Sequence, residues 1–352
     1  MAKKRYSFFK KTIISILLII LISGVLGGYW VYKAIYQSNV SLGDKKSQII
    51  YIHTGSDFND VMNMLYEKNI IVHRTSFEWL AEKKNYKNNI KPGKYRILAR
   101  MSNNELINLL RAGLQEPVRI TFTNIRTKAQ LVSRVCLKIE ADSIVMGRLL
   151  NDNTFLKKYG MNSDNVLILF IPHSYEFYWN TSPEQFLERM AQEYKKIWTE
   201  ERKLKARNMR FTQTEISILA SIVQAEQSRF DEEKPAIAGL YINRLKKGMP
   251  LQSDPTLVYA NGNFSVTRVL NQDKEIDSPY NTYKYIGLPP GPICLPEVSS
   301  LDAVLNYEKH DYLYMCAKDD LSCKHNFAKT LDQHNVYASK YRNALNKRNI
   351  KR

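Results

Sequence analysis

The stretch Leu219-Ala-Ser-Ile-Val-Gln-Ala-Glu226 lies in a segment that is apolar on nearly every side and ends in a carboxylate. The segment opens with helix-start signals: Thr212 is a candidate N-cap, and Glu215 stands at the third helical position to complete a capping box. A helix that is apolar almost all round lies inside a domain. We therefore expect this helix to form the buried centre of the fold.

Glu226 falls four residues after Ile222 and three after Val223, which places it on the apolar stripe of that helix. Burial disfavours the charged form and raises the pKa of a carboxyl group, as a general acid requires near neutral pH. The alternative is a solvated glutamate at a helix end, paired with Arg229 at i+3. Because most glutamates are solvated, spacing alone favours this alternative.

An apolar run from Ile13 to Val31 approaches the ~20 residues that cross a bilayer as a helix. The basic residues before it, such as Lys3, Lys4 and Arg5, would stay in the cytoplasm by the positive-inside rule. A cleaved signal peptide is the alternative, but no Ala-x-Ala-like site follows the run. We predict a cytoplasmic tail (1–11), a transmembrane helix (12–32) and an extracytoplasmic, periplasmic body on a single-pass anchor.

The formal net charge is +18 and the pI is about 9.5. In a soluble chain this would suggest nucleic acid, but the predicted topology argues against such a partner. Phospholipid headgroups and cell-wall carboxylates are the polyanions outside the membrane. Cys316 and Cys323 flank a predicted turn between two strand-like runs, so a disulfide between them is conceivable in an oxidising compartment. The cysteines show no metal-ligand spacing, and we expect no metal and no cofactor.

Residues 46–115 read as a small α/β module of short strands and helices, and residues 116–345 read as an α+β domain. Within the second domain, the apolar run 166–172 is consistent with a buried strand, and residues 184–208 with one long charged helix. A proline-rich stretch with several loops follows, from Pro255 to Pro296, and is a candidate for binding loops. The expected fold class is α+β.

Several motifs follow one another in the second domain: Leu219 to Glu226, Tyr241-Ile-Asn-Arg-Leu245, Gly248-Met-Pro-Leu-Gln-Ser-Asp-Pro-Thr256, Ser278-Pro-Tyr-Asn-Thr-Tyr283, Gly287-Leu-Pro-Pro-Gly-Pro-Ile293 and His325-Asn-Phe327. In this order they resemble the motifs of the YceG-like endolytic murein transglycosylases, which are membrane-anchored enzymes. The region 50–113 is similar to the family's LysM-like module. The resemblance implies a LysM-like module followed by an α+β catalytic domain, acting on newly made glycan beside the penicillin-binding synthases.

The family's catalytic glutamate falls on Glu226, which reverses the preference drawn from spacing. Many members have a second glutamate where this chain has Gln224, so any role of that residue elsewhere is in doubt here. Loops predicted to border the groove contribute candidate substrate-binding residues: Gln252, Asp254, Asn281 and Tyr283. For Asp254 the alternative is an N-cap before Pro255. We expect His325, Asn243 and Arg244 to be structural at least as readily as ligand-binding.

The resemblance implies a lyase that cleaves the MurNAc-GlcNAc β-1,4 bond within a strand. An ordinary glycosidase needs two carboxylates. A lytic transglycosylase instead lets the C6 hydroxyl of the sugar close on C1, leaving a 1,6-anhydro end, so that Glu226 can act first as acid and then as base. Two rivals stay open: a non-catalytic peptidoglycan-binding scaffold for wall synthases, and a hydrolase with Asp254 or Asp277 as second carboxylate.

Overall fold

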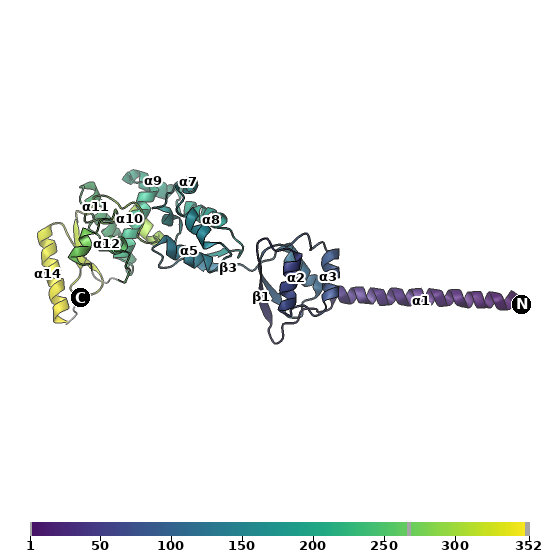
Figure 1. Ribbon diagram of the computed structural model, residues 1–352. Coiled ribbons are helices and arrows are strands. Elements are labelled where there is room, and N and C mark those ends of the chain that lie inside the picture. Colours follow the sequence, from purple (N-terminus) through teal and green to yellow (C-terminus); the bar gives the residue numbers. More distant parts are fainter. Residues whose placement is uncertain (1, 266–268, 349–352) are drawn as a thin grey trace. The chain divides into compact units, whose positions relative to one another are not determined.

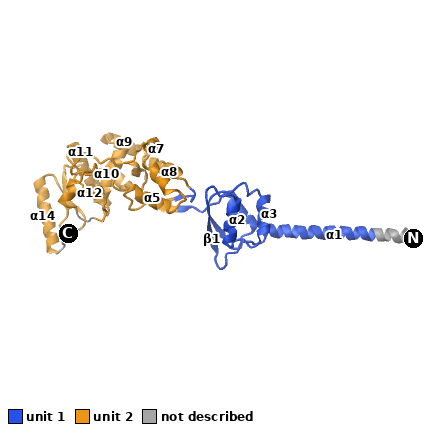
Figure 2. Ribbon diagram, in the orientation of Figure 1, with its two compact units in different colours: residues 1–118, 176–180 blue, residues 119–175, 181–352 orange. Residues whose placement is uncertain are grey.

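The computed structural model describes residues 2–265 and 269–348, with side chains from residue 10 onward. The side chains of Lys3, Lys4 and Arg5, in the predicted cytoplasmic tail, lie outside this description. The chain divides into two compact units, Met1–Val118 with Glu176–Asn180, and Arg119–Tyr175 with Thr181–Arg352 (Figure 2). Both combine helices with small sheets, so the predicted α+β class with an N-terminal apolar helix is confirmed at this level.

The first unit begins with the long helix α1 (Ala2–Tyr36), which precedes a small domain (Figure 1). The elements of that domain are β1 (Ser47–Ile52), α2 (Phe58–Glu67), α3 (Arg74–Lys83), β2 (Gly93–Leu98) and α4 (Asn103–Ala112). β1 and β2 pair antiparallel, with Ile50 opposite Tyr95 and Ile52 opposite Gly93. Their inward side chains pack with the buried faces of the three short helices into one hydrophobic core.

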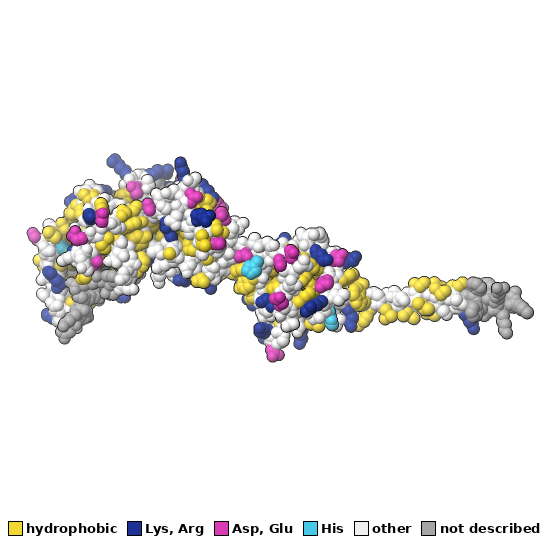
Figure 3. Space-filling model, viewed as in Figure 1, with side chains coloured by type: hydrophobic (Ala, Val, Ile, Leu, Met, Phe, Trp, Pro, Cys, Tyr) yellow, Lys and Arg dark blue, Asp and Glu magenta, His cyan; other side chains and the backbone are white. Residues whose placement is uncertain are grey.

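Helix α1 contains a stretch, Lys10–Tyr36, whose length and most apolar 18 residues, with a mean hydropathy of 2.3, suit a membrane span, a test that a signal sequence also passes. Hydrophobic side chains are exposed along much of its described length (Figure 3). The end of the helix belongs to the small domain: Ala34 is buried, its carbonyl accepts a hydrogen bond of 2.9 Å from Asn103, and Trp30 contacts the ring of Trp79.

The second unit is mostly helical. Its first half contains β3 (Val118–Thr121), α5 (Lys128–Cys136), α6 (Ser143–Leu149), α7 (Asn153–Leu156), η1 (Lys157–Tyr159), η2 (Val166–Leu169), β4 (Ser174–Phe177), α8 (Pro183–Ile197) and α9 (Glu200–Met209). Its second half contains α10 (Gln213–Glu226), η3 (Asp231–Glu233), α11 (Lys234–Lys246), α12 (Asp254–Asn261), η4 (Asn271–Glu275), α13 (Val298–Leu305), β5 (Tyr314–Ala317), β6 (His325–Ala328) and α14 (Leu331–Lys347). β3 pairs with β4, and β5 pairs antiparallel with β6.

Helix α10 is the centre of the second unit, as its sequence predicts. Every residue from Ile216 to Val223 is buried, and the helix packs against α9, α11, α12 and α13. The predicted capping box is present, since the Thr212 hydroxyl accepts from the backbone of Glu215 and the Glu215 carboxylate accepts from the backbone of Thr212. This start signal sets the phase of the helix and therefore the place of Glu226 at its end.

Two expectations about the second unit are wrong. The apolar run at 166–172 is not a strand: Val166–Leu169 form a 3-10 turn in which all four residues are buried. A short, fully buried run has no periodicity that separates the two conformations. Residues 184–208 form two helices, because Thr199 accepts from the backbone of Arg202 and starts α9 anew.

The cysteines are unpaired. Cys136, Cys294, Cys316 and Cys323 are all free thiols in the structure. Cys316 faces Asn326 in the β5–β6 pairing, and Cys323 lies in the turn between the strands. The disulfide considered from the sequence is therefore not formed here.

Candidate active site

Glu226 is the last residue of α10, at the point where the buried helix reaches the surface. Ala225 before it is exposed, whereas Glu226 itself is only partly exposed, and Gln227 ends the helix by donating its backbone N–H to the carbonyl of Val223. The carboxylate is therefore held by a largely buried helix but stands at its accessible end.

Two hydroxyl groups hold one oxygen of this carboxylate. Tyr241, from α11, and Ser253, directly before α12, each donate a hydrogen bond of 2.5 Å to Oε1 of Glu226. Both donors are almost completely buried. The acid at the end of α10 is thus oriented by side chains from two further helical segments.

Burial raises the pKa of Glu226 above its ordinary value. The hydrogen bonds from Ser253 and Tyr241 and the attraction of His325 oppose this shift, and repulsion from Asp254 adds to it. Burial also raises the pKa of Tyr241, and the neighbouring Glu226 raises it further. The phenol therefore keeps its proton and donates the hydrogen bond. A carboxyl group with a raised pKa is suited to donate a proton near neutral pH and to take one back.

The solvated arrangement considered for Glu226 differs from what is observed. Arg229 does not pair with Glu226: its guanidinium lies 3.2 Å from the sulfur of Cys323. The carboxylate of Glu226 instead accepts hydrogen bonds from Tyr241 and Ser253. Spacing within the helix could not reveal these two partners, since they lie 15 and 27 residues away in the chain.

The predicted substrate-binding residues Asp254 and Tyr283 lie together beside this acid. Asp254 is exposed and accepts a hydrogen bond of 2.5 Å from the phenol of Tyr283. Burial raises the pKa of Tyr283, and its bond to Asp254 adds to the shift. The N-cap interpretation of Asp254 is wrong, because Ser253 occupies the N-cap position of α12 and Asp254 is the first helical residue.

Gln252 and Asn281 have different surroundings. Gln252 is exposed, has a positive φ of 53°, and accepts from the Arg244 guanidinium at 3.2 Å. Asn281 is fully buried, and its amide nitrogen donates to the carbonyls of Lys274 and Ile276 at 2.8 Å each. Its amide oxygen accepts from the backbone of Tyr283 at 3.0 Å. The Asn281 side chain thus holds together the loop that presents Tyr283.

Arg244 has an internal role, as one of the two sequence interpretations had it. Its guanidinium donates to the carbonyls of Leu313, at 2.6 Å, and Leu251, at 2.8 Å, and the residue is buried. Arg244 therefore supports the segment that leads into Ser253.

A second carboxylate, that of Glu233, is buried and contacts the residue that follows Glu226. Glu233 accepts from the side chain of Gln227 at 2.6 Å, and from the ring and the backbone N–H of His325 at 2.9 and 2.8 Å. Burial alone would raise the pKa of Glu233, but these hydrogen bonds lower it. The ionised Glu233 thus fixes the residue that follows Glu226 and the ring of His325.

Sequence reasoning missed Tyr241, Ser253 and Glu233 as members of the site. The first two stand inside the ordered motifs quoted above, so membership in those motifs was the available signal. Glu233 stands outside them, and only the fold brings it to His325, 92 residues further along the chain.

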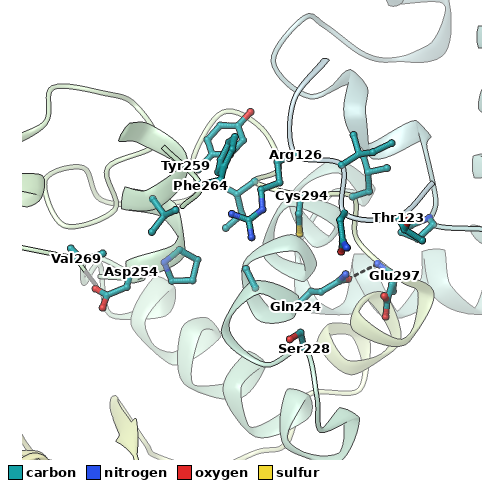
Figure 4. A pocket seen from close by; sticks show the side chains of 18 of the residues that line it. Thr123, Arg126, Gln224, Ser228, Asp254, Tyr259, Phe264, Val269, Cys294 and Glu297 are labelled. Atoms are coloured by element: carbon teal, nitrogen blue, oxygen red, sulfur yellow. Dashed lines mark hydrogen bonds between the residues drawn. The ribbon is translucent and has the colours of Figure 1, made fainter. Parts of the chain in front are cut away.

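A cavity of about 1060 Å³ is lined by residues close to Glu226 in the chain, although Glu226 itself is not among the lining residues (Figure 4). The lining includes Asp254 together with Ala225 and Ser228, which lie one residue before and two residues after Glu226 in the chain. The rings of Tyr259 and Phe264 line another part of the wall. A cavity of this size, with mixed polar and aromatic walls, is typical of a small-molecule or oligosaccharide site.

Comparisons with known proteins relate the chain to one family. Residues 50–340 match the model of the YceG-like family. The chain is 29% identical over 340 residues to the endolytic murein transglycosylase of Bacillus subtilis (strain 168), covering 92% of this chain and 93% of the relative.

Two more similarities point the same way. The endolytic murein transglycosylase of Streptococcus pneumoniae (serotype 2, strain D39) is 28% identical over 324 residues, which are 83% of this chain but only 58% of that protein. The crystal structure of a YceG-like protein from Listeria monocytogenes superposes with a TM-score of 0.55 and 28% identity, covering 83% of this chain and 99% of that one. By the match to the family model over most of its length, this chain belongs to the YceG-like family.

Proposed function

We propose that this protein is an endolytic peptidoglycan lytic transglycosylase and that Glu226 is its catalytic acid and base. The observation that carries the proposal is the carboxyl group of Glu226, held by Tyr241 and Ser253 beside the cavity, with a raised pKa. The family membership supplies the substrate class, murein.

In the proposed reaction, protonated Glu226 gives its proton to the oxygen of the MurNAc-GlcNAc β-1,4 bond as the bond between that oxygen and C1 breaks. The C6 hydroxyl of the same muramoyl sugar forms a new bond to C1, and ionised Glu226 takes the hydroxyl proton. Water is not consumed, and the product ends in 1,6-anhydro-MurNAc. One carboxyl group serves both steps because the first step leaves it in the basic form that the second requires.

Tyr241 and Ser253 would position Glu226, because both donate to the same oxygen and leave the other one for the substrate. We propose Gln252, Asp254 and Tyr283 as groups that contact the sugar. Asn281 would serve the site by shaping the 274–284 loop. The 46–115 module is proposed to be LysM-like, and the 116–345 region to be the catalytic domain.

We propose a single-pass anchor in the cytoplasmic membrane, with the N-terminus in the cytoplasm and the body outside, next to nascent glycan and its penicillin-binding synthases. The burial of Ala34 in the small domain and the contact of Trp30 with Trp79 favour an anchor over a cleaved signal sequence, because cleavage would remove these contacts from that domain.

The test is mass spectrometry of uncrosslinked glycan strands incubated with the full-length protein in detergent, beside Glu226→Gln. Glu308→Gln, at an exposed glutamate, is the matched control. Anhydro ends from the wild type and the control, but not from Glu226→Gln, are the expected result. Reducing ends would favour the hydrolase, and binding without products would favour the scaffold.

A further inference from the structure

The cavity beside Glu226 carries an arginine that the proposed reaction does not use. The guanidinium of Arg126 lies 5.0 Å from the ring centre of Phe264, and Arg126 is seen near Tyr259 and Phe264 in Figure 4. The Tyr259 ring lies 6.2 Å from that of Phe264 and 4.6 Å from that of Tyr280. Stacking on an aromatic face orients a guanidinium and leaves its N–H groups at the edge free to bind.

The acidic side chains that line the cavity have partners, whereas its arginines form no ion pair within the described residues. Its acids have partners: Asp254 accepts from Tyr283, and Glu297 lies 4.0 Å from the buried ammonium of Lys234. Its two arginines, Arg126 and Arg342 of α14, form no ion pair with any residue in the described ranges 10–265 and 269–348. The cavity therefore offers cations that can accept an anionic ligand.

The distance along α12 relates these groups to the acid. Ser253 and Asp254 at its start are next to Glu226, and Tyr259 lies five residues later, about 7.5 Å along a helix that rises 1.5 Å per residue. Asp254, Tyr259 and Arg126 line the same cavity, so a substituent on a sugar bound at Glu226 can reach Arg126.

The anions available on the proposed substrate are few. The sugar rings of a glycan strand carry hydroxyl and acetamido groups, and in an intact strand the lactyl group of the muramoyl sugar is tied up as an amide. The free carboxylates are those of the stem peptide attached to it. A guanidinium binds a carboxylate through parallel N–H groups, which suits Arg126 to this ligand.

We infer that Arg126, assisted by Arg342, binds a carboxylate of the stem peptide, so that the enzyme selects glycan strands that still carry their peptides. This inference rests on the proposed function and names a specificity determinant of the same site. Because the contact is remote from the bond that breaks, it strengthens substrate binding and transition-state binding alike, and its loss raises KM while kcat stays the same.

The experiment compares three uncrosslinked substrates: native strands, strands whose peptide carboxylates have been converted to amides, and strands freed of peptide by an amidase. The full-length protein is compared with Arg126→Gln and Arg342→Gln. Arg134→Gln, an exposed arginine of α5 outside the cavity, is the matched control for net charge.

The wild type is expected to show a KM about fivefold higher on amidated than on native strands, the upper end for an exposed charge pair. Arg126→Gln should raise the KM on native strands by the same factor and leave the KM on amidated strands unchanged, with a smaller effect from Arg342→Gln and none from Arg134→Gln.

Equal KM values for the wild type on native and amidated strands would overturn the inference. So would an Arg126→Gln effect that persists on peptide-free strands, because amidase treatment exposes the lactyl carboxylate, which would then be the ligand. Binding of the same three strands to Glu226→Gln, with and without Arg126→Gln, reads the preference independently of cleavage. Absence of anhydro ends on every substrate would refute the proposed reaction alone.

Discussion

Ser253 donates a hydrogen bond of 2.5 Å to Oε1 of Glu226, although Ser253 occupies the N-cap position of α12. An N-cap serine ordinarily accepts a hydrogen bond from its own helix. Here the hydroxyl caps nothing and serves the acid at the end of α10 instead. The start of α12 is thus built around the orientation of Glu226.

Ser253→Ala is expected to raise the pKa of Glu226 further, because it removes a donor that stabilises the ionised form. The protonated acid would persist to higher pH, so the alkaline limb of the pH profile of kcat/KM should shift to higher pH. The maximal rate should fall. Ser182→Ala is the control, since Ser182 caps α8 by accepting from Gln185. The control should lose about 1 kcal/mol of stability with an unchanged profile. An unmoved alkaline limb for Ser253→Ala would show that its hydroxyl does not act on Glu226.

Glu226→Gln is expected to stabilise the fold at neutral pH. Burial raises the pKa of Glu226, so the folded state holds a proton that the unfolded chain releases above about pH 4.5. Wild-type stability therefore falls as the pH rises from there through the folded pKa. The amide avoids this cost and keeps an oxygen for Tyr241 and Ser253.

Urea unfolding from pH 4 to pH 8 measures the effect. The variant should be more stable by about 1 kcal/mol at pH 8, and the difference should vanish as the pH falls to the ordinary range of a glutamate. A variant that is less stable than wild type at pH 8 would contradict a costly buried charge.

Asn281→Ala is expected to cost about 2 kcal/mol or more of stability, because it leaves two buried carbonyls and a backbone N–H without their partner. Asn261→Ala is the matched control: Asn261 is exposed and makes one side-chain bond, of 3.3 Å, to Asp273. Its stability should change by less than about 0.5 kcal/mol. Thermal unfolding of the two variants measures the difference. Equal melting temperatures would show that the side chain of Asn281 does not stabilise the loop.

The limits of sequence reasoning follow the range of the interactions. The Thr212–Glu215 capping box is local, and it was predicted at the right residues. The 166–169 run is too short and too uniformly apolar for periodicity to decide its conformation, so its 3-10 turn was missed.

The site divides in the same way. The place of Glu226 on α10 follows from helical phase, and its assignment as catalytic from the resemblance. Its partners Tyr241 and Ser253 come from other segments, so only the packing of α10 against α11 and α12 could show them. The burial of Asn281 also depends on the folded loop, and the residues next to it in the sequence do not predict it.

Glu233→Gln is expected to have the opposite pH dependence to Glu226→Gln. The hydrogen bonds from His325 and Gln227 outweigh burial and lower the pKa of Glu233, so the ionised folded form contributes stability above about pH 4.5 that is lost as the pH falls through the lowered pKa. An amide at this position presents an NH2 group where two donors converge on Oε2. The variant should therefore be less stable than wild type at pH 7, by about 1–3 kcal/mol, with the gap narrowing toward low pH.

Because Gln227 follows Glu226 directly, loosening its side chain should also lower kcat. Glu232→Gln is the neighbouring control, since Glu232 is exposed and pairs only with Lys324 in the described structure. Urea unfolding across the same pH range measures the change in stability. The change in kcat is measured separately at 10 °C, where the wild type and Glu233→Gln both remain folded. A stability gap that widens toward low pH would mean that Glu233 is held in its protonated form, and an unchanged kcat would confine its role to the fold of the 227–233 segment.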